Sequence, residues 1–117
     1  MLLLAGDVGG TSARLAYCRV QDEKVEVISK QVYPSRQFGG LVELIRKFMS
    51  VHSEVADAAC FSIAGPVRSD HVVTPNLGWV VDAGDLSHRL SIRNVHVIND
   101  LEANAYGIPS LEPSDQP

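Results

Sequence analysis

Three strand-like segments follow one another at the start of the chain, separated only by short turns. They are the apolar run 2–5 and the alternating segments 12–20 and 25–32. Gly9-Gly10 and the polar residues 21–24 separate them, and glycine tolerates the positive φ of a tight hairpin turn. Strands joined so closely pair antiparallel. The sequence therefore predicts a sheet that opens with three antiparallel strands.

After these strands, helices and strands alternate. Four apolar residues recur at helical spacing and predict an amphipathic helix: Leu41, Leu44, Ile45 and Phe48. Two further helices are predicted at residues 85–90 and 101–106. Strands are predicted at residues 56–64, 72–74, 79–81 and 95–98, the first of them buried on both faces. This order predicts an α/β fold, with a mixed sheet covered by helices on both faces.

The length and charge of the chain restrict its partners. Its 117 residues fit one domain, and the formal net charge is −4 with no run of Lys or Arg. Nucleic acids and anionic membranes require a cationic surface, so we expect neither as a partner. The longest apolar run, residues 1–5, is too short to span a membrane. Cys18 and Cys60 are predicted to be buried free thiols, so we expect a cytoplasmic protein.

The segment Asp7-Val8-Gly9-Gly10-Thr11 is the first candidate site. Glycines at a turn let backbone N–H groups approach a phosphate, and the Thr11 hydroxyl adds a donor. Asp7, at the end of a strand, is suited to Mg²⁺, which takes few carboxylates and keeps several waters. The alternative is a hairpin in which Gly9 and Gly10 serve only the turn. Arg14 could face a phosphate, but a solvated arginine is the favoured interpretation.

The pair Asn99-Asp100 is the second candidate site, at the end of the strand predicted at 95–98. Ligands of open α/β sheets bind beyond the carboxyl ends of the strands. Asp100 is therefore suited to accept a hydrogen bond from a substrate hydroxyl. The alternative is helix capping, with Asn99 as the N-cap and Glu102 completing a capping box.

A third candidate site combines a rigid Gly65-Pro66 turn with Asn76 and Trp79. An indole face below a sugar ring and an amide at its rim would form a sugar platform. The alternative is a structural turn together with a tryptophan in the core, and this alternative is favoured.

Taken in order, these segments resemble the bacterial glucokinase family, within the hexokinase, ROK and actin-like ATPase group. The similar segments are residues 6–16, 63–67, 76–79 and 98–103. Two departures are Ser12, where many relatives have Asn, and Pro75, where Thr is usual. The resemblance covers nearly the whole chain. It implies the ribonuclease H-like fold of the actin-like ATPases.

The resemblance also implies a reaction, in which ATP and glucose give glucose 6-phosphate and ADP. Asp100 would be the general base for the sugar 6-hydroxyl. Asn99 and Asn76 would line the sugar pocket, and Gly65 would shape it. Asp7, Gly9, Gly10 and Thr11 would serve the ATP phosphates and Mg²⁺, with Asp7 holding the metal through water.

Members of the family continue into a second, larger lobe. We therefore expect residues 1–108 to form the N-terminal lobe, and residues 109–117 to be a linker or a cut end. The isolated chain should be inactive, and the full-length protein a homodimer. Alternatives are a kinase for another hexose or an N-acetylhexosamine, a sugar-binding regulator of the ROK type, and a free-standing interaction domain. Such regulators carry a DNA-binding segment ahead of the segment that corresponds to Asp7–Thr11. Because Asp7 lies almost at the start of this sequence, we do not expect that segment here.

Overall fold

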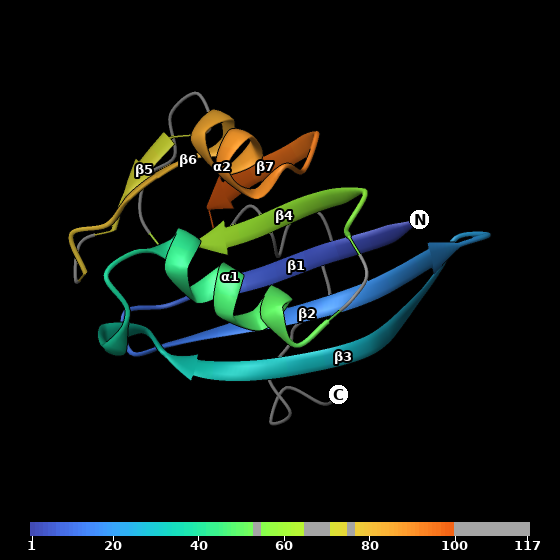
Figure 1. Cartoon of the computed structure of the whole chain (residues 1–117), viewed down its shortest axis with the longest axis horizontal. Coiled ribbons are helices and arrows are strands. Elements are labelled where there is room, and N and C mark those ends of the chain that lie inside the picture. The colour runs from blue at the N-terminus through green and yellow to red at the C-terminus, as the bar shows by residue number, and fades with distance from the viewer. Residues whose placement is uncertain (53–54, 65–70, 75–76, 100–117) are drawn as a thin grey trace.

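The computed structural model describes residues 1–52, 55–64, 71–74 and 77–99, and its elements are shown in Figure 1. The main sheet contains β1 (Leu2–Val8), β2 (Ser12–Gln21), β3 (Lys24–Pro34), β4 (Ala58–Ile63) and β7 (Asn94–Asn99). A second sheet contains β5 (His71–Val73) and β6 (Val80–Asp82). The helices are η1 (Ser35–Gln37, a 3₁₀ turn), α1 (Leu41–Ser50) and α2 (Ala83–Leu90). No helix within these described ranges is long and apolar enough to cross a bilayer.

The strand order of the main sheet is β3-β2-β1-β4-β7. β1 pairs antiparallel with β2, which pairs antiparallel with β3, while β1–β4 and β4–β7 are parallel pairs. The predicted mixed sheet with three antiparallel opening strands is therefore confirmed. The parallel strands β1, β4 and β7 are neighbours, so their carboxyl ends meet at one edge of the sheet.

β2 is buried on both faces in its middle. Ala13, Leu15 and Tyr17 point into the main core, as their alternation predicts. On the opposite face, Ala16 and Cys18 are also buried and pack with the half-buried β1 residues Leu3 and Ala5. β4 differs from its prediction, because only alternate residues are fully buried and the others are half-buried.

The two α-helices lie on the same face of the main sheet (Figure 1). α1 contributes the buried side chains Leu44, Ile45 and Phe48 to a core that α2 shares. The Arg46 guanidinium of α1 donates a hydrogen bond of 3.2 Å to the carbonyl of Arg89 in α2. The helix expected at 101–106 lies outside the described residues.

Candidate functional site

The ends of the three parallel strands align at one edge of the sheet. Val8, the last residue of β1, lies opposite Ile63 of β4, and Ile63 lies opposite Asn99 of β7. Neighbouring strands are about 4.8 Å apart, so the ends of β1 and β7 are separated by roughly 10 Å. Figure 1 shows β4 and β7 running in the same direction, toward the edge where β1 turns into β2. The structure therefore brings the Gly9–Thr11 turn and Asn99 to the same edge.

The turn between β1 and β2 is held tightly. The Gly9 N–H donates to the Ser12 carbonyl at 2.9 Å, and a Cβ added to Gly9 would lie 3.2 Å from that oxygen. Neither Gly9 nor Gly10 has a positive φ, since Gly78 is the only described glycine that does, so the turn does not use the left-handed conformation that glycine tolerates. The glycine at position 9 is needed for close approach of the backbone rather than for a left-handed conformation.

Two backbone N–H donors of this turn make no hydrogen bond within the part of the chain that the structure describes. The N–H groups of Gly10 and Thr11 have no acceptor among the described residues, whereas the carbonyls of Gly9 and Thr11 both accept hydrogen bonds from the protein. Thr11 is exposed, and Gly10 is half-buried. Adjacent N–H groups at an exposed turn are a suitable binding site for an anion.

Asp7 and Arg14 lie opposite each other on β1 and β2. The Nη1 of Arg14 is 4.0 Å from the Oδ2 of Asp7, and their side chains are 23% and 39% exposed. The sequence favoured a solvated arginine, but Arg14 is instead partly buried and paired with the candidate metal residue. This ion pair places a guanidinium beside the turn that offers N–H donors.

The charge and surroundings of Asp7 fit one kind of metal site. No three His, Cys, Asp or Glu side chains gather into a metal-binding group within the described part of the chain. Asp7 offers a partly exposed carboxylate at the end of a strand. A single carboxylate suits Mg²⁺ that keeps several waters and also binds phosphate oxygens, rather than a metal enclosed by protein ligands.

The predicted sugar side of the site is only partly described. Asn99 is half-buried at the carboxyl end of β7. Asp100, Asn76 and Gly65 lie outside the described residues, as does the helix start that Asn99 would cap. The roles of these four residues stay predictions.

Hydrogen bonds join the residues on either side of the segment that contains Asn76. The Thr74 N–H donates to the Trp79 carbonyl, and the Trp79 N–H donates to Thr74 Oγ1, both at 2.9 Å. Gly78, with φ 67°, donates its N–H to the Thr74 carbonyl. Trp79 is 7% exposed and belongs to the main core. The favoured interpretation, a tryptophan in the core, is therefore confirmed, and the indole of Trp79 is not an exposed platform.

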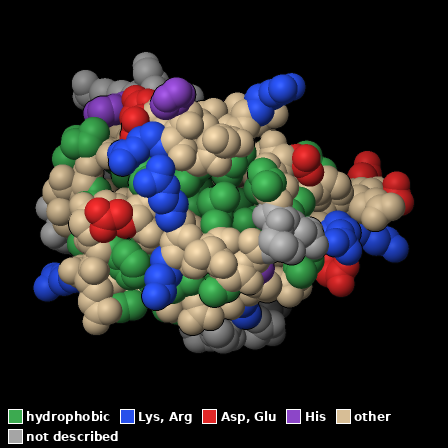
Figure 2. Space-filling view, in the orientation of Figure 1, with side chains coloured by type: hydrophobic (Ala, Val, Ile, Leu, Met, Phe, Trp, Pro, Cys, Tyr) green, Lys and Arg blue, Asp and Glu red, His purple; other side chains and the backbone are tan. Residues whose placement is uncertain are grey.

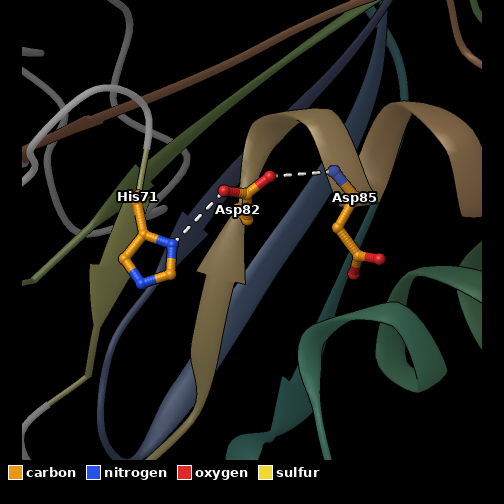
Figure 3. A network of polar contacts seen from close by, with 3 residues as sticks. All are labelled: His71, Asp82 and Asp85. Carbon is orange, nitrogen blue, oxygen red and sulfur yellow. Dashed lines mark hydrogen bonds and ion pairs between the residues drawn. The ribbon is translucent and has the colours of Figure 1, made fainter.

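A polar network fixes the start of α2 to β5 (Figure 3). Asp82 accepts a hydrogen bond of 2.9 Å from the Asp85 N–H, and its other oxygen lies 3.3 Å from the Nδ1 of His71. The Asp85 N–H, and then His71, hold the pKa of Asp82 below its ordinary value. This cap was not predicted, and α2 begins at Ala83, two residues before the predicted start at Asp85. The signal available in the sequence was Asp82 itself, because an aspartate can cap a helix by accepting a hydrogen bond from the N–H three residues later.

Ser35 is a second residue that the sequence analysis missed. It is fully buried, and its hydroxyl donates to the Gly9 carbonyl at 2.9 Å. The contact joins residues 26 positions apart, so no local pattern indicates it.

Two other features lie away from this edge. Cys18 and Cys60 are free thiols, as predicted, but only Cys18 is fully buried and Cys60 is half-buried; partial or full burial raises the pKa of both.

Figure 2 shows acidic and basic side chains together at the tip of the β2–β3 hairpin, on the right of the view. β2 runs from the Gly9–Thr11 turn to this tip, so the two are separated by about 30 Å.

Comparison with known proteins identifies the family. The family model described as Glucokinase matches residues 4–116. A glucokinase from Nostoc punctiforme is 35% identical over 116 residues, which are 97% of this chain and 34% of that protein. The crystal structure of a glucokinase from an Antarctic psychrotroph has a TM-score of 0.84 and 32% identity, covering 97% of this chain and 36% of that one.

A more distant structure agrees with the fold. A ROK family glucokinase from Streptomyces griseus, solved in complex with glucose and AMPPNP, has a TM-score of 0.70 and 22% identity. It covers 92% of this chain and 36% of that one. The predicted α/β fold, a ribonuclease H-like lobe of the actin-like ATPase kind, is confirmed. The chain spans about a third of the length of the curated relatives it matches. It belongs to the glucokinase family.

Proposed function

We propose that this chain is the N-terminal lobe, residues 1–108, of an enzyme that phosphorylates glucose at the 6-hydroxyl with ATP. Residues 109–117 would lead toward the second lobe. The observation that carries the proposal is the shared sheet edge, where the turn, whose Gly10 and Thr11 N–H groups have no acceptor among the described residues, and the end of β7 are separated by roughly 10 Å. Family membership supports the same reaction.

The turn would bind the phosphates of ATP. The N–H groups of Gly10 and Thr11 are suited to phosphate oxygens, and Gly9 keeps the backbone close. Asp7 would hold Mg²⁺ through water, as its single carboxylate allows. Magnesium, when bound, neutralises negative charge on the phosphates.

Asp100 would orient the glucose 6-hydroxyl and accept its proton. The hydroxyl oxygen forms a bond to the γ-phosphorus, the bond from this phosphorus to the ADP oxygen breaks, and the proton moves to the Asp100 carboxylate. Asn99, at the end of β7, would hydrogen-bond the sugar with Asn76, beside a backbone shaped by Gly65. Phosphoryl transfer depends mainly on such alignment and on charge neutralisation.

A second lobe would complete the enzyme. Closure of two lobes around the substrates excludes water and limits hydrolysis of ATP.

We also propose that the complete protein is cytoplasmic and forms a homodimer. Analytical ultracentrifugation would test the dimer.

The test is Asp100→Asn in the complete two-lobed protein. If Asp100 is the base, kcat for glucose falls by about 10²–10⁴-fold while the melting temperature is kept. Asp22→Asn is a matched control at the hairpin tip, where φ is 52° and asparagine is tolerated. A variant that loses stability but keeps its specific activity would assign Asp100 to helix capping instead.

A further inference from the structure

Ser35 connects the end of β3 to the turn between β1 and β2. It begins η1 directly after β3, and its side chain is completely buried. Its hydroxyl donates to the Gly9 carbonyl at 2.9 Å, and its N–H donates to the Thr11 carbonyl at 3.1 Å. One residue therefore holds the carbonyls on both sides of Gly10.

These bonds engage carbonyl groups of the turn that would otherwise be open to a ligand. The Ser12 carbonyl is also occupied, by the Gly9 N–H. Carbonyl oxygens repel phosphate, and here those of Gly9, Thr11 and Ser12 are all bonded to protein donors. The N–H groups of Gly10 and Thr11, which attract phosphate, have no acceptor within the described ranges.

Ser35 is itself held firmly. Its carbonyl accepts a hydrogen bond of 3.1 Å from the Phe38 N–H, which closes η1. The Phe38 ring packs edge-on against Tyr33, with ring centres 5.8 Å apart, and Tyr33 packs against Phe48 of α1 at 6.5 Å. The position of the Ser35 hydroxyl is thus fixed by packing onto the main core.

We propose that Ser35 is a positioning residue, which keeps the Gly9–Thr11 turn in the conformation that binds the nucleotide phosphates. This inference rests on the proposed function. Because Ser35 is fully buried, it acts through Gly9 and Thr11 and does not touch the nucleotide. Without its hydroxyl, the Gly9 carbonyl loses its donor, and the turn is free to sample conformations in which the two N–H groups diverge.

The experiment is a titration of the ¹⁵N-labelled chain with MgATP, followed through the amide signals of Gly10 and Thr11. Ser35→Ala is compared with the wild type and with Ser29→Ala. Ser29 is a matched control, because its hydroxyl bonds the Nε2 of His52 at 2.6 Å and contacts no part of the turn. Loss of one hydrogen bond, about 1.4 kcal/mol, corresponds to about tenfold in affinity.

We expect Ser35→Ala to raise the Kd for MgATP about tenfold, while Ser29→Ala binds like the wild type. Equal binding by Ser35→Ala and the wild type would overturn the inference and leave the proposed function intact. An equal loss in Ser29→Ala would also overturn it, since the effect would then be general destabilisation. If MgATP leaves the wild-type Gly10 and Thr11 signals unchanged, the proposed phosphate site fails, and the inference fails with it.

Discussion

The Phe61 ring of β4 packs directly onto the backbone of Gly6 in β1. The two residues lie opposite each other in the parallel ladder, and both face the interior. A Cβ added to Gly6 would lie 2.6 Å from the Cδ1 of Phe61 and 2.9 Å from the Cδ2 of Leu15. Phe61 and Leu15 are fully buried, so neither side chain can move aside freely.

We therefore expect Gly6→Ala to destabilise the chain by about 1–3 kcal/mol through overpacking. Urea denaturation measures the loss. Gly40→Ala is the control, because a Cβ there meets nothing within 4 Å, so this variant should lose only the preference of the α1 N-cap for glycine over alanine. If both variants unfold at the same urea concentration, the close contact between Gly6 and Phe61 does not exclude a larger side chain at position 6.

Thr74 supplies the acceptor for a buried backbone donor. Thr74→Val keeps the shape of the side chain but leaves the Trp79 N–H without its partner. We expect a loss of about 1–3 kcal/mol in the free energy of unfolding. Thr74→Ser keeps the oxygen and should retain most of the stability. Fluorescence of the single tryptophan reports unfolding next to the changed bond, and equal stability of both variants would contradict this role.

Asp82 makes the free energy of unfolding depend on pH in the acid range. Its pKa is lowered in the folded state, first by the Asp85 N–H and then by His71, so folding favours the charged carboxylate. This stabilisation is complete above the pKa of the unfolded state and is lost as the pH falls through the folded-state pKa. We expect Asp82→Ala to melt below the wild type at pH 7, and the difference to shrink below about pH 4. A difference that stays constant through the acid range would count against the capping carboxylate.

The purified 117-residue chain should show no measurable glucose phosphorylation. A single lobe cannot close over its substrates, and the proposed site is built for two lobes. A coupled assay for glucose 6-phosphate is the measurement, and the complete two-lobed protein is the positive control. Turnover by the chain alone would show that the second lobe is dispensable.

The fold was predictable where the signal is local. The alternation of Ala13, Leu15 and Tyr17 correctly predicted the buried face of β2, and the spacing of Leu41 to Phe48 correctly predicted α1. β1 runs three residues further than predicted, through Asp7 to Val8, because pairing with both β2 and β4 outweighs the low strand propensity of Gly6 and Asp7.

The candidate site was predictable in its residues rather than in its geometry. The Gly9–Thr11 turn was identified from its glycines, but the reason for a glycine at position 9 was not, since that reason is close approach to the Ser12 carbonyl rather than a positive φ. The Ser35 contact depends on the packing of η1, which sequence spacing does not encode. For Trp79 the favoured interpretation, a core tryptophan, was correct, because a lone large aromatic side chain is usually buried.

The shared edge of β1, β4 and β7 has a consequence for the order of folding. β1, β2 and β3 form consecutive hairpins, which fold quickly because their contacts are local. β7 is the last strand described along the chain, and within the sheet it is connected to β1 only through β4, with which it pairs. During synthesis the glycine turn thus emerges long before Asn99, and a partly folded chain exposes one half of the site without the other.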